Sequence, residues 1–178
     1  SASKLLVRSI EFDIDDQKYT LLENELSKID EYVEQVLYYA RLDSFSRDYL
    51  IQEYGLKGII QPVIRSQANY FIQKNIRYEI VGEDHTVLTD AKWIAFIFNQ
   101  LLSNAIKYTP EGGKINFTAE YVRESEKYSG YHLYRFVIRD NGIGMSEDFL
   151  EKLFEPFARE EKVKVGKFHG TGLGLSIA

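Results

Sequence analysis

Residues 90–110 have the sequence DAKWIAFIFNQLLSNAIKYTP, a largely apolar stretch around which the rest of the chain can be organised. Asp90 is a residue type that favours the N-cap of a helix, and Pro110 is one that ends a helix. Neither Gly nor Pro occurs between Ala91 and Tyr108. The stretch therefore predicts a helix over 91–108, and its apolar content indicates that this helix is buried on most sides.

A narrow polar stripe interrupts the apolar surface of this helix. Gln100, Asn104 and Lys107 recur at i, i+4 and i+7, so they share one face. Such a stripe commonly faces solvent. It equally suits the wall of a cavity, because an amide oxygen is a ligand for a hard cation such as Mg²⁺ and a lysine pairs with a phosphate. The stripe alone leaves both interpretations open.

Shorter elements flank the helix on both sides. Before it, Pro62 is placed to begin a helix that runs to about Asn75. Residue patterns predict strands at 77–81, 86–89, 114–122 and 131–139, and a short helix near 147–153. A dense domain is expected from residue 54 to residue 178. Helices interspersed with strands predict an α+β fold, a two-layer α/β sandwich in which helices cover one face of a mixed sheet.

A glycine-containing motif, DNGIGM at 140–145, follows the last of these strands. Glycines after a strand let the backbone turn sharply and approach a ligand closely. Asp140 ends the strand, where its carboxylate would lie at the floor of a pocket and accept a hydrogen bond from an amino group. The alternative is an ordinary Asp-Asn-Gly turn.

A second glycine motif, GTGLGL at 170–175, opens what the pattern predicts as a final helix. Alternating glycines before a helix make a cradle of backbone N–H groups for an anion. No Gly-Lys-Ser/Thr follows, so the motif is not a P-loop. No strand directly precedes it, which argues against the dinucleotide-binding fingerprint.

The motif FEPF at 154–157, followed by Arg159, lies between the two glycine motifs. One interpretation is a hydrophobic anchor that holds a loop down. The other combines it with the charged segment 160–167, which reads as mobile, into a flap that covers a nucleotide.

The segment from Tyr19 to about Leu42 contains neither Gly nor Pro and carries a thin apolar seam. The seam residues are spaced alternately by four and three positions, as in a coiled coil: Leu22, Leu26, Ile29, Val33, Val36 and Ala40. So thin a seam favours packing against a second helix, and too little chain precedes Tyr19 to supply one of full length. We expect association with a second copy; the alternative is a helix that lies on its own domain.

Composition excludes several classes of function. The chain has 178 residues, no Cys and a formal net charge of −5. It therefore has no disulfide scaffold, thiol nucleophile or Cys-ligated zinc, and its acidic balance disfavours a nucleic-acid partner. No apolar run reaches the roughly 18 residues of a membrane span. The Ser-Ala-Ser start lacks the features of a signal peptide, which indicates a piece of a longer protein.

Taken in order, four motifs resemble the N, G1, F and G2 boxes of sensor histidine kinases: NAIKYTP (104–110), DNGIGM (140–145), FEPF (154–157) and GTGLGL (170–175). The resemblance implies that residues 54–178 form a catalytic ATP-binding domain of the Bergerat type. Residues 1–48 resemble the dimerisation and histidine-phosphotransfer helices, with the first helix truncated. The segment YARLD (39–43) resembles more specifically the antimicrobial-peptide-sensing kinases of Gram-positive bacteria.

The resemblance implies roles for residues at the phosphate end of the site. Asn104 would hold Mg²⁺, with Gln100 as a further candidate ligand. Lys107 would reach the phosphates of ATP, and Arg159 would meet the γ-phosphate. Asn104, Lys107 and Arg159 are thus the expected catalytic residues.

The resemblance also implies the rest of the nucleotide site. Tyr108 would pack near the nucleotide, and Asp140 would accept from the adenine amino group, directly and through water. The loop residues expected to shape the site or approach the phosphates are Gly142, Gly144, Gly170, Thr171, Gly172, Leu173 and Gly174.

Two departures from the family pattern bear on the chemistry. Many relatives have Asn one turn before the magnesium Asn, where this chain has Gln100. Some relatives have a carboxylate two turns before it, where this chain has Phe96, so no general base is assigned. The lack of that carboxylate disfavours an ATP-gated conformational module. Such a module, and a protein-serine kinase of the same ATPase superfamily, are the alternatives.

The implied enzyme is a protein histidine kinase, whose phosphohistidine passes its phosphate to an aspartate of a response regulator. None of His85, His132 and His169 has the His-Glu-x-Lys/Thr-Pro surroundings of a phosphoacceptor, so the acceptor is expected outside these residues. The implied whole protein is a bacterial membrane protein that forms homodimers through the 19–42 helix. This chain would be a cytoplasmic portion, attached to the membrane only by upstream segments.

Overall fold

The computed structural model describes the chain over residues 49–122, 133–160 and 171–178, together with residues 18–19, 21–22, 25–26, 29–30, 32–33 and 36–37. Apart from its last two residues, the chain divides into two compact units, residues 1–46 and residues 47–176.

The described residues of the first unit are all helical, from Lys18 to Leu37. This agrees with the helix expected from Tyr19, whose last residues, 38–42, lie outside the described part. The seam is largely exposed within the single chain: Ile29 is 54% exposed, and Val33 and Val36 are each 52% exposed. More than half of each of these three side chains is therefore exposed in the described part of the helix.

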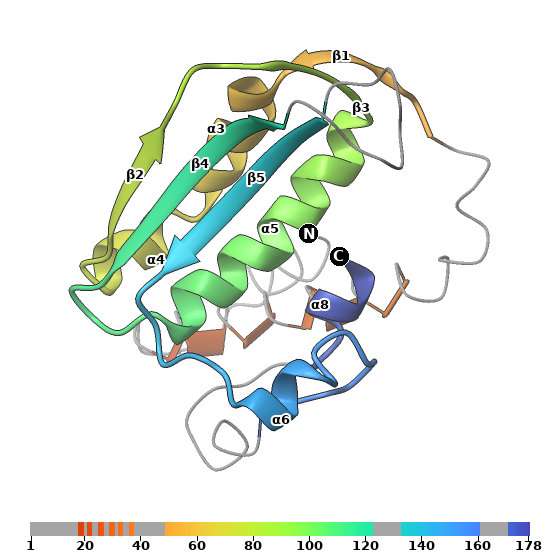
Figure 1. Ribbon diagram of the computed structural model, residues 1–178. Helices are drawn as coiled ribbons and strands as arrows, with labels where there is room; N and C mark the ends of the chain where they lie inside the picture. Colours follow the sequence, from red (N-terminus) through yellow and green to blue (C-terminus); the bar gives the residue numbers. More distant parts are fainter. Residues whose placement is uncertain are drawn as a thin grey trace. The chain divides into compact units, whose positions relative to one another are not determined.

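The second unit is built on a three-stranded mixed sheet (Figure 1). Its strands are β2 (Arg77–Val81), β4 (Lys114–Val122) and β5 (Leu133–Asp140), in the order β2-β4-β5. Strand β4 runs parallel to β2 and antiparallel to β5. A separate antiparallel pair joins β1 (Gln52–Gly55) to β3 (Thr86–Thr89).

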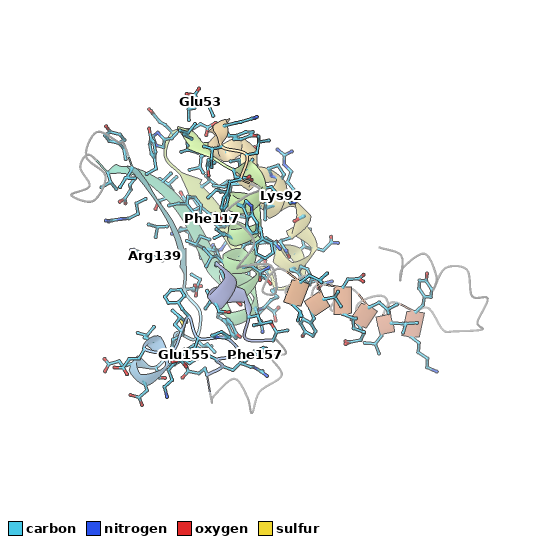
Figure 2. The ribbon with its side chains drawn as sticks, turned by 90° about the vertical axis from the view of Figure 1, so that its right-hand side faces the viewer. Glu53, Lys92, Phe117, Arg139, Glu155 and Phe157 are labelled. Carbon is cyan, nitrogen blue, oxygen red and sulfur yellow. The ribbon has the colours of Figure 1, made fainter. Side chains whose placement is uncertain are left out.

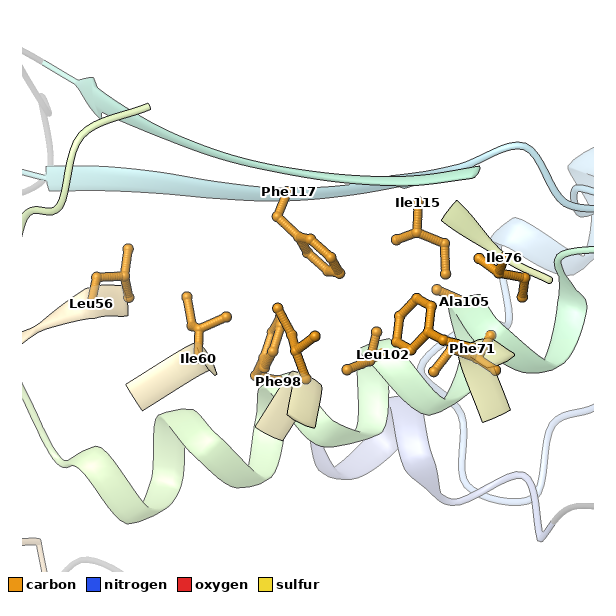
Figure 3. Packing of buried hydrophobic residues seen from close by; sticks show 11 residues of the cluster. Leu56, Ile60, Phe71, Ile76, Phe98, Leu102, Ala105, Ile115 and Phe117 are labelled. Atoms are coloured by element: carbon orange, nitrogen blue, oxygen red, sulfur yellow. The ribbon is translucent and has the colours of Figure 1, made fainter. Parts of the chain in front are cut away.

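Helices cover one face of the sheet, as Figure 3 shows. They are α3 (Leu56–Ser66), α4 (Ala68–Gln73) and α5 (Ala91–Tyr108). Two short helices follow β5, namely α6 (Glu147–Leu150) and α8 (Gly174–Ile177). The expected two-layer α/β arrangement with a mixed sheet is confirmed. No helix in the described part of the chain is long and apolar enough to cross a membrane.

The core lies between α5 and the inner face of β4. Phe117 and Ile115 alternate with polar residues along β4, and both are fully buried, as is Leu102 on α5. The ring of Phe98 on α5 contacts Phe117 and Phe136 edge-on, with centroids 5.7 and 5.4 Å apart. Figures 2 and 3 show Phe117 between the sheet and the helices. This packing fixes α5 against the strands that lead into the glycine motif at 140–145.

The helix expected to begin at Pro62 begins earlier, because a distant loop caps it. Helix α3 starts at Leu56, whose amide donates to the carbonyl oxygen of His85 at 2.9 Å. The next amide, of Lys57, donates to Asp84 Oδ1 at 2.8 Å. Pro62 therefore lies inside α3, and the predicted helix to Asn75 is divided at Gln67 into α3 and α4. The short helix expected to run to Leu153 ends at Leu150.

Candidate functional site

The polar stripe of α5 is only partly accessible to solvent. Gln100 is only 5% exposed, and Asn104 and Lys107 are half-buried. A solvated stripe would leave long polar side chains accessible, so the cavity-wall interpretation fits better. The segments that lie near this stripe are the glycine motif at 140–145 and the start of α8.

The motif at 140–145 is attached to the C-terminal end of α5. Strand β5 ends at Asp140, which pairs with the buried Ile115 of β4 and therefore belongs to the helix-covered face of the sheet. The amide of Ile143 donates to the carbonyl oxygen of Tyr108 at 3.2 Å. This bond brings the exposed Asp140 carboxylate and the last turn of α5 into one small region.

Gly142 is confined between these two segments. Its amide donates to Asp140 Oδ1 at 2.8 Å. A Cβ at this position would lie 2.6 Å from Asp140 Oδ1 and 2.7 Å from the Tyr108 carbonyl oxygen. A side chain larger than hydrogen would therefore displace either the carboxylate or the end of α5. Gly144 instead has φ +66°, a backbone conformation that favours glycine.

Asn141, which was not among the predicted site residues, anchors the base of the same loop. Its Oδ1 accepts from the amide of Lys114 at 2.7 Å, and its own amide donates to the Lys114 carbonyl oxygen at 3.3 Å. The side chain thus continues the β4–β5 pairing past the end of β5. An Asn before a Gly is the residue expected in such a turn, so the signal was present in the motif.

The end of α5 is also held by Lys74, which was not among the predicted site residues. Lys74 Nζ donates to the carbonyl oxygens of Ile106, Lys107 and Thr109, the first two at 2.7 and 3.1 Å. A cation at this end complements the helix dipole. Burial lowers the pKa of Lys74 below its usual value. No local pattern marks this residue, since its partners lie more than 30 positions away.

The side chains of Lys107 and Tyr108 lie together at the end of α5. Lys107 Nζ is 5.0 Å from the centre of the Tyr108 ring, within cation–π range. Burial raises the pKa of Tyr108, and the positive charge of Arg159 opposes that rise. Arg159 is therefore close enough to Tyr108 for their charges to interact, although it comes from the segment after the FEPF motif.

The first residue of α8 packs against the stripe. A Cβ on Gly174 would lie 3.0 Å from Gln100 Oε1 and 3.8 Å from Asn104 Nδ2. Figures 1 and 3 both place α8 beside α5. Leu173, next to Gly174, is buried, and its amide donates to Thr171 Oγ1 at 3.2 Å. Gly170 lies outside the described residues.

The FEPF segment is joined to the second glycine motif. The amide of Phe157 donates to the Gly172 carbonyl oxygen at 3.0 Å. Gly172 has φ +77°, and a Cβ there would lie 2.7 Å from the Phe157 carbonyl carbon, so only glycine fits. The Phe154 and Phe157 side chains are 68% and 65% exposed, which is against a buried hydrophobic anchor. In Figure 2, Phe157 and Glu155 lie at the opposite end of the second unit from Glu53.

Glu160, the first residue of the charged segment 160–167, is packed. Glu160 is 8% exposed, and its Oε2 accepts from the amide of Ser146 at 3.2 Å. Ser146 Oγ in turn caps α6 by accepting from the Phe149 amide at 3.3 Å. The carboxylate of Glu160 thus closes the loop that starts at Ser146. Residues 161–170 are outside the described part.

Two observations bear on what the site can bind. Among the described residues, no group of three His, Asp or Glu side chains forms a metal site. An amide oxygen is also a ligand type that Mg²⁺ accepts, and the stripe carries the amides of Gln100 and Asn104. A separate small hollow between α3 and the sheet, lined by Leu56, Ile60 and Phe136 among others, is remote from these residues and mainly apolar.

The second half of the chain matches a known protein family. The model of the family of histidine kinase-, DNA gyrase B- and HSP90-like ATPases matches residues 89–178. The chain belongs to this family of ATPases.

Its relatives are sensor kinases. The chain is 30% identical to the sensor histidine kinase YxdK of Bacillus subtilis over 165 residues, which cover 92% of this chain and 48% of YxdK. It is 30% identical to the sensor protein BceS of Halalkalibacterium halodurans over 147 residues, 82% of this chain and 41% of BceS. The chain thus spans less than half the length of each relative.

Solved structures show the same fold. The catalytic domain of the histidine kinase ThkA is 31% identical, with a TM-score of 0.57 over 72% of this chain and 76% of that one. The histidine kinase AdeS of Acinetobacter baumannii is 21% identical, with a TM-score of 0.70 over 93% of this chain and 72% of that one. The resemblance to histidine kinases noted in the motifs is therefore confirmed.

Proposed function

We propose that the chain is the ATP-binding catalytic portion of a sensor histidine kinase. It transfers the γ-phosphate of ATP to a histidine outside these 178 residues, for onward transfer to an aspartate of a response regulator. One observation carries the proposal: both glycine motifs contact the polar stripe of α5 or its end. Gly142 packs on Tyr108, and Gly174 packs on Gln100 beside Asn104.

In this proposal the nucleobase lies at the Asp140 end of the site. Adenine has an exocyclic amino group, and a carboxylate is a strong acceptor for it. Asp140 is exposed, so it is accessible to a ligand, and the bond from the Gly142 amide to Oδ1 orients the carboxylate. The half-buried Tyr108 supplies an aromatic surface at the same end.

The phosphates extend toward Lys107, Asn104 and the start of α8. Lys107 supplies a positive charge, and Asn104 supplies the amide oxygen that would hold Mg²⁺. The bound ion would neutralise phosphate charge during phosphoryl transfer. Gly174 opens α8 beside Asn104, so the backbone of the 170–175 motif is the proposed cradle for the phosphates. Arg159, whose positive charge acts on Tyr108, would meet the γ-phosphate.

Calorimetry with Mg-ATP tests the adenine assignment. Asp140→Ala removes one charged hydrogen bond and should weaken binding by ~1.5–3 kcal/mol, roughly tenfold to a hundredfold. Glu120→Ala is a matched control, because Glu120 is an exposed carboxylate on the opposite face of the sheet, paired with Arg135. Equal affinities for wild type and Asp140→Ala would exclude this adenine pocket.

The partners follow from the same proposal. The solved complex of ThkA contains the response regulator TrrA, and a receiver domain of that kind is the proposed partner here. The exposed seam from Leu22 to Val36 supports a homodimer through the 19–42 helix. Attachment to a membrane would come from segments outside this chain.

The relatives are sensor kinases, which favours this function over an ATP-gated module or a protein-serine kinase.

A further inference from the structure

Gln100 differs from the other residues of the polar stripe in its burial. It is 5% exposed, whereas Asn104 and Lys107 are half-buried. Its Oε1 lies 3.0 Å from the position of a Cβ on Gly174, so the amide faces the backbone where α8 begins. A buried amide whose end is directed at another element is typical of a packing contact. Mg²⁺ usually keeps several water ligands, which a residue this buried is poorly placed to accommodate.

We infer that Gln100 is a positioning residue rather than a metal ligand: it holds the first residue of α8 against α5 and so sets where the Thr171–Leu173 segment stands relative to Asn104. The consequence of this contact is the placement of the phosphate-binding backbone, and that consequence rests on the proposed function. The contact itself is a property of the protein without nucleotide.

The contacts on either side of Gly174 explain why this placement matters. Leu173 is 1% exposed and is linked to Thr171 by a short hydrogen-bonded turn, so a shift of Gly174 moves the whole segment. The Thr171–Leu173 segment has a second attachment, the close contact of Gly172 with the backbone of Phe157. Thr171–Leu173 is thus held at one side by Phe157 and at the other by Gln100.

A double-mutant cycle on the nucleotide-free chain tests the contact. Gly174→Ala places a methyl group against Gln100 Oε1, and Gln100→Ala removes that obstacle. We expect Gly174→Ala to raise the unfolding constant by about tenfold in the wild-type background and by less than about twofold beside Gln100→Ala. Equal effects in both backgrounds would overturn the inference. Circular dichroism identifies any variant that fails to fold, and the milder Gln100→Asn then replaces Gln100→Ala.

Calorimetry with ADP, with and without Mg²⁺, separates positioning from metal binding. A positioning role predicts that Gln100→Ala weakens ADP binding by a similar factor, about tenfold, in Mg²⁺ and in chelator. Gln100→Asn should behave like Gln100→Ala, because the shorter side chain does not reach Gly174. If Gln100→Ala lost ADP affinity only in the presence of Mg²⁺, and Gln100→Asn restored that affinity, Gln100 would instead be a metal ligand. If the wild type bound no ADP, the proposed function would fail, whereas the nucleotide-free cycle would still decide the contact.

Discussion

The amide of Ile143 donates a hydrogen bond to the carbonyl oxygen of Tyr108, 3.2 Å away. Residues 35 positions apart are thereby joined through their backbones. The bond ties the loop that carries Asp140 to the turn that carries Lys107. In the proposed site these residues bind opposite ends of a nucleotide, so the bond fixes the distance between the two ends.

Gly142→Ala should disrupt this junction. The added methyl group would stand 2.6 Å from Asp140 Oδ1 and 2.7 Å from the Tyr108 carbonyl oxygen, so one of the two must move. We expect at least a tenfold loss of ATP affinity in calorimetry, with the far-UV circular dichroism spectrum retained. Gly58→Ala is the matched control. Nothing lies within 4 Å of a Cβ there, and alanine should stabilise α3 by ~0.5–1 kcal/mol. Equal ATP affinities in both variants would contradict the prediction.

Much of this site could be predicted because its signals are local. The limits of α5 follow from Asp90 and Pro110, and Asp90 does cap the helix by accepting from the Lys92 and Trp93 amides. The residue pattern at 114–122 predicted a strand, and β4 has these bounds. The glycine motif at 140–145 predicted a sharp turn of the backbone, and Gly144 has a positive φ there.

The unpredicted features depend on partners distant in sequence. Strand β1 has no alternation in its residues QEYG and exists through pairing with β3. The start of α3 depends on Asp84 and His85, which satisfy its first amides from another loop. The packing of Gln100 on Gly174 joins two motifs that are 74 positions apart. No window of sequence contains both members of such a pair.

Lys74→Met should destabilise the end of α5. The substitution keeps an apolar stem but leaves the carbonyl oxygens of Ile106, Lys107 and Thr109 without their ammonium donor. We expect a loss of ~1–3 kcal/mol in the free energy of unfolding, measured by chemical denaturation. ATP binding should weaken as well, because this turn carries Lys107 and Tyr108.

Lys92→Met provides the comparison at the other end of the same helix. Lys92 is exposed in the first turn of α5, where a positive charge is unfavourable to the helix dipole. Its removal should leave stability within ~0.5 kcal/mol of wild type. A similar loss in both variants would mean that Lys74 contributes only as a generic surface lysine.

Asp90 should make stability depend on acid pH. The Leu50 amide bond to Oδ2 is the main cause that lowers its pKa below 3.8, followed by bonds from Trp93 and Lys92. Because the folded pKa is depressed, this contribution is present above the unfolded pKa and is lost as pH falls through the folded pKa.

Asp90→Asn isolates this effect. The amide has one acceptor oxygen, so it cannot serve both the Leu50 amide and the amides at the start of α5. We expect a loss of ~1–2 kcal/mol in the free energy of unfolding at pH 7. The difference from wild type should shrink below about pH 4, as Asp90 becomes protonated. Asp148→Asn, on exposed α6, is the control. A difference that is constant from pH 7 to pH 3 would refute the role of the charge.

The exposed seam of the first unit should drive weak self-association. Ile29 and Val33 are each more than half exposed in the single chain, and a heptad seam of this kind is buried against a second helix. We expect the full chain to show concentration-dependent sedimentation, and Ile29→Glu to abolish it, because a buried charge opposes packing. Leu21→Glu is the matched control, since Leu21 is 61% exposed but lies outside the spacing of the seam. Its association should stay close to that of wild type. Sedimentation as a monomer at every concentration for all three chains, or equal loss in both variants, would show that the seam is not the surface that joins two copies.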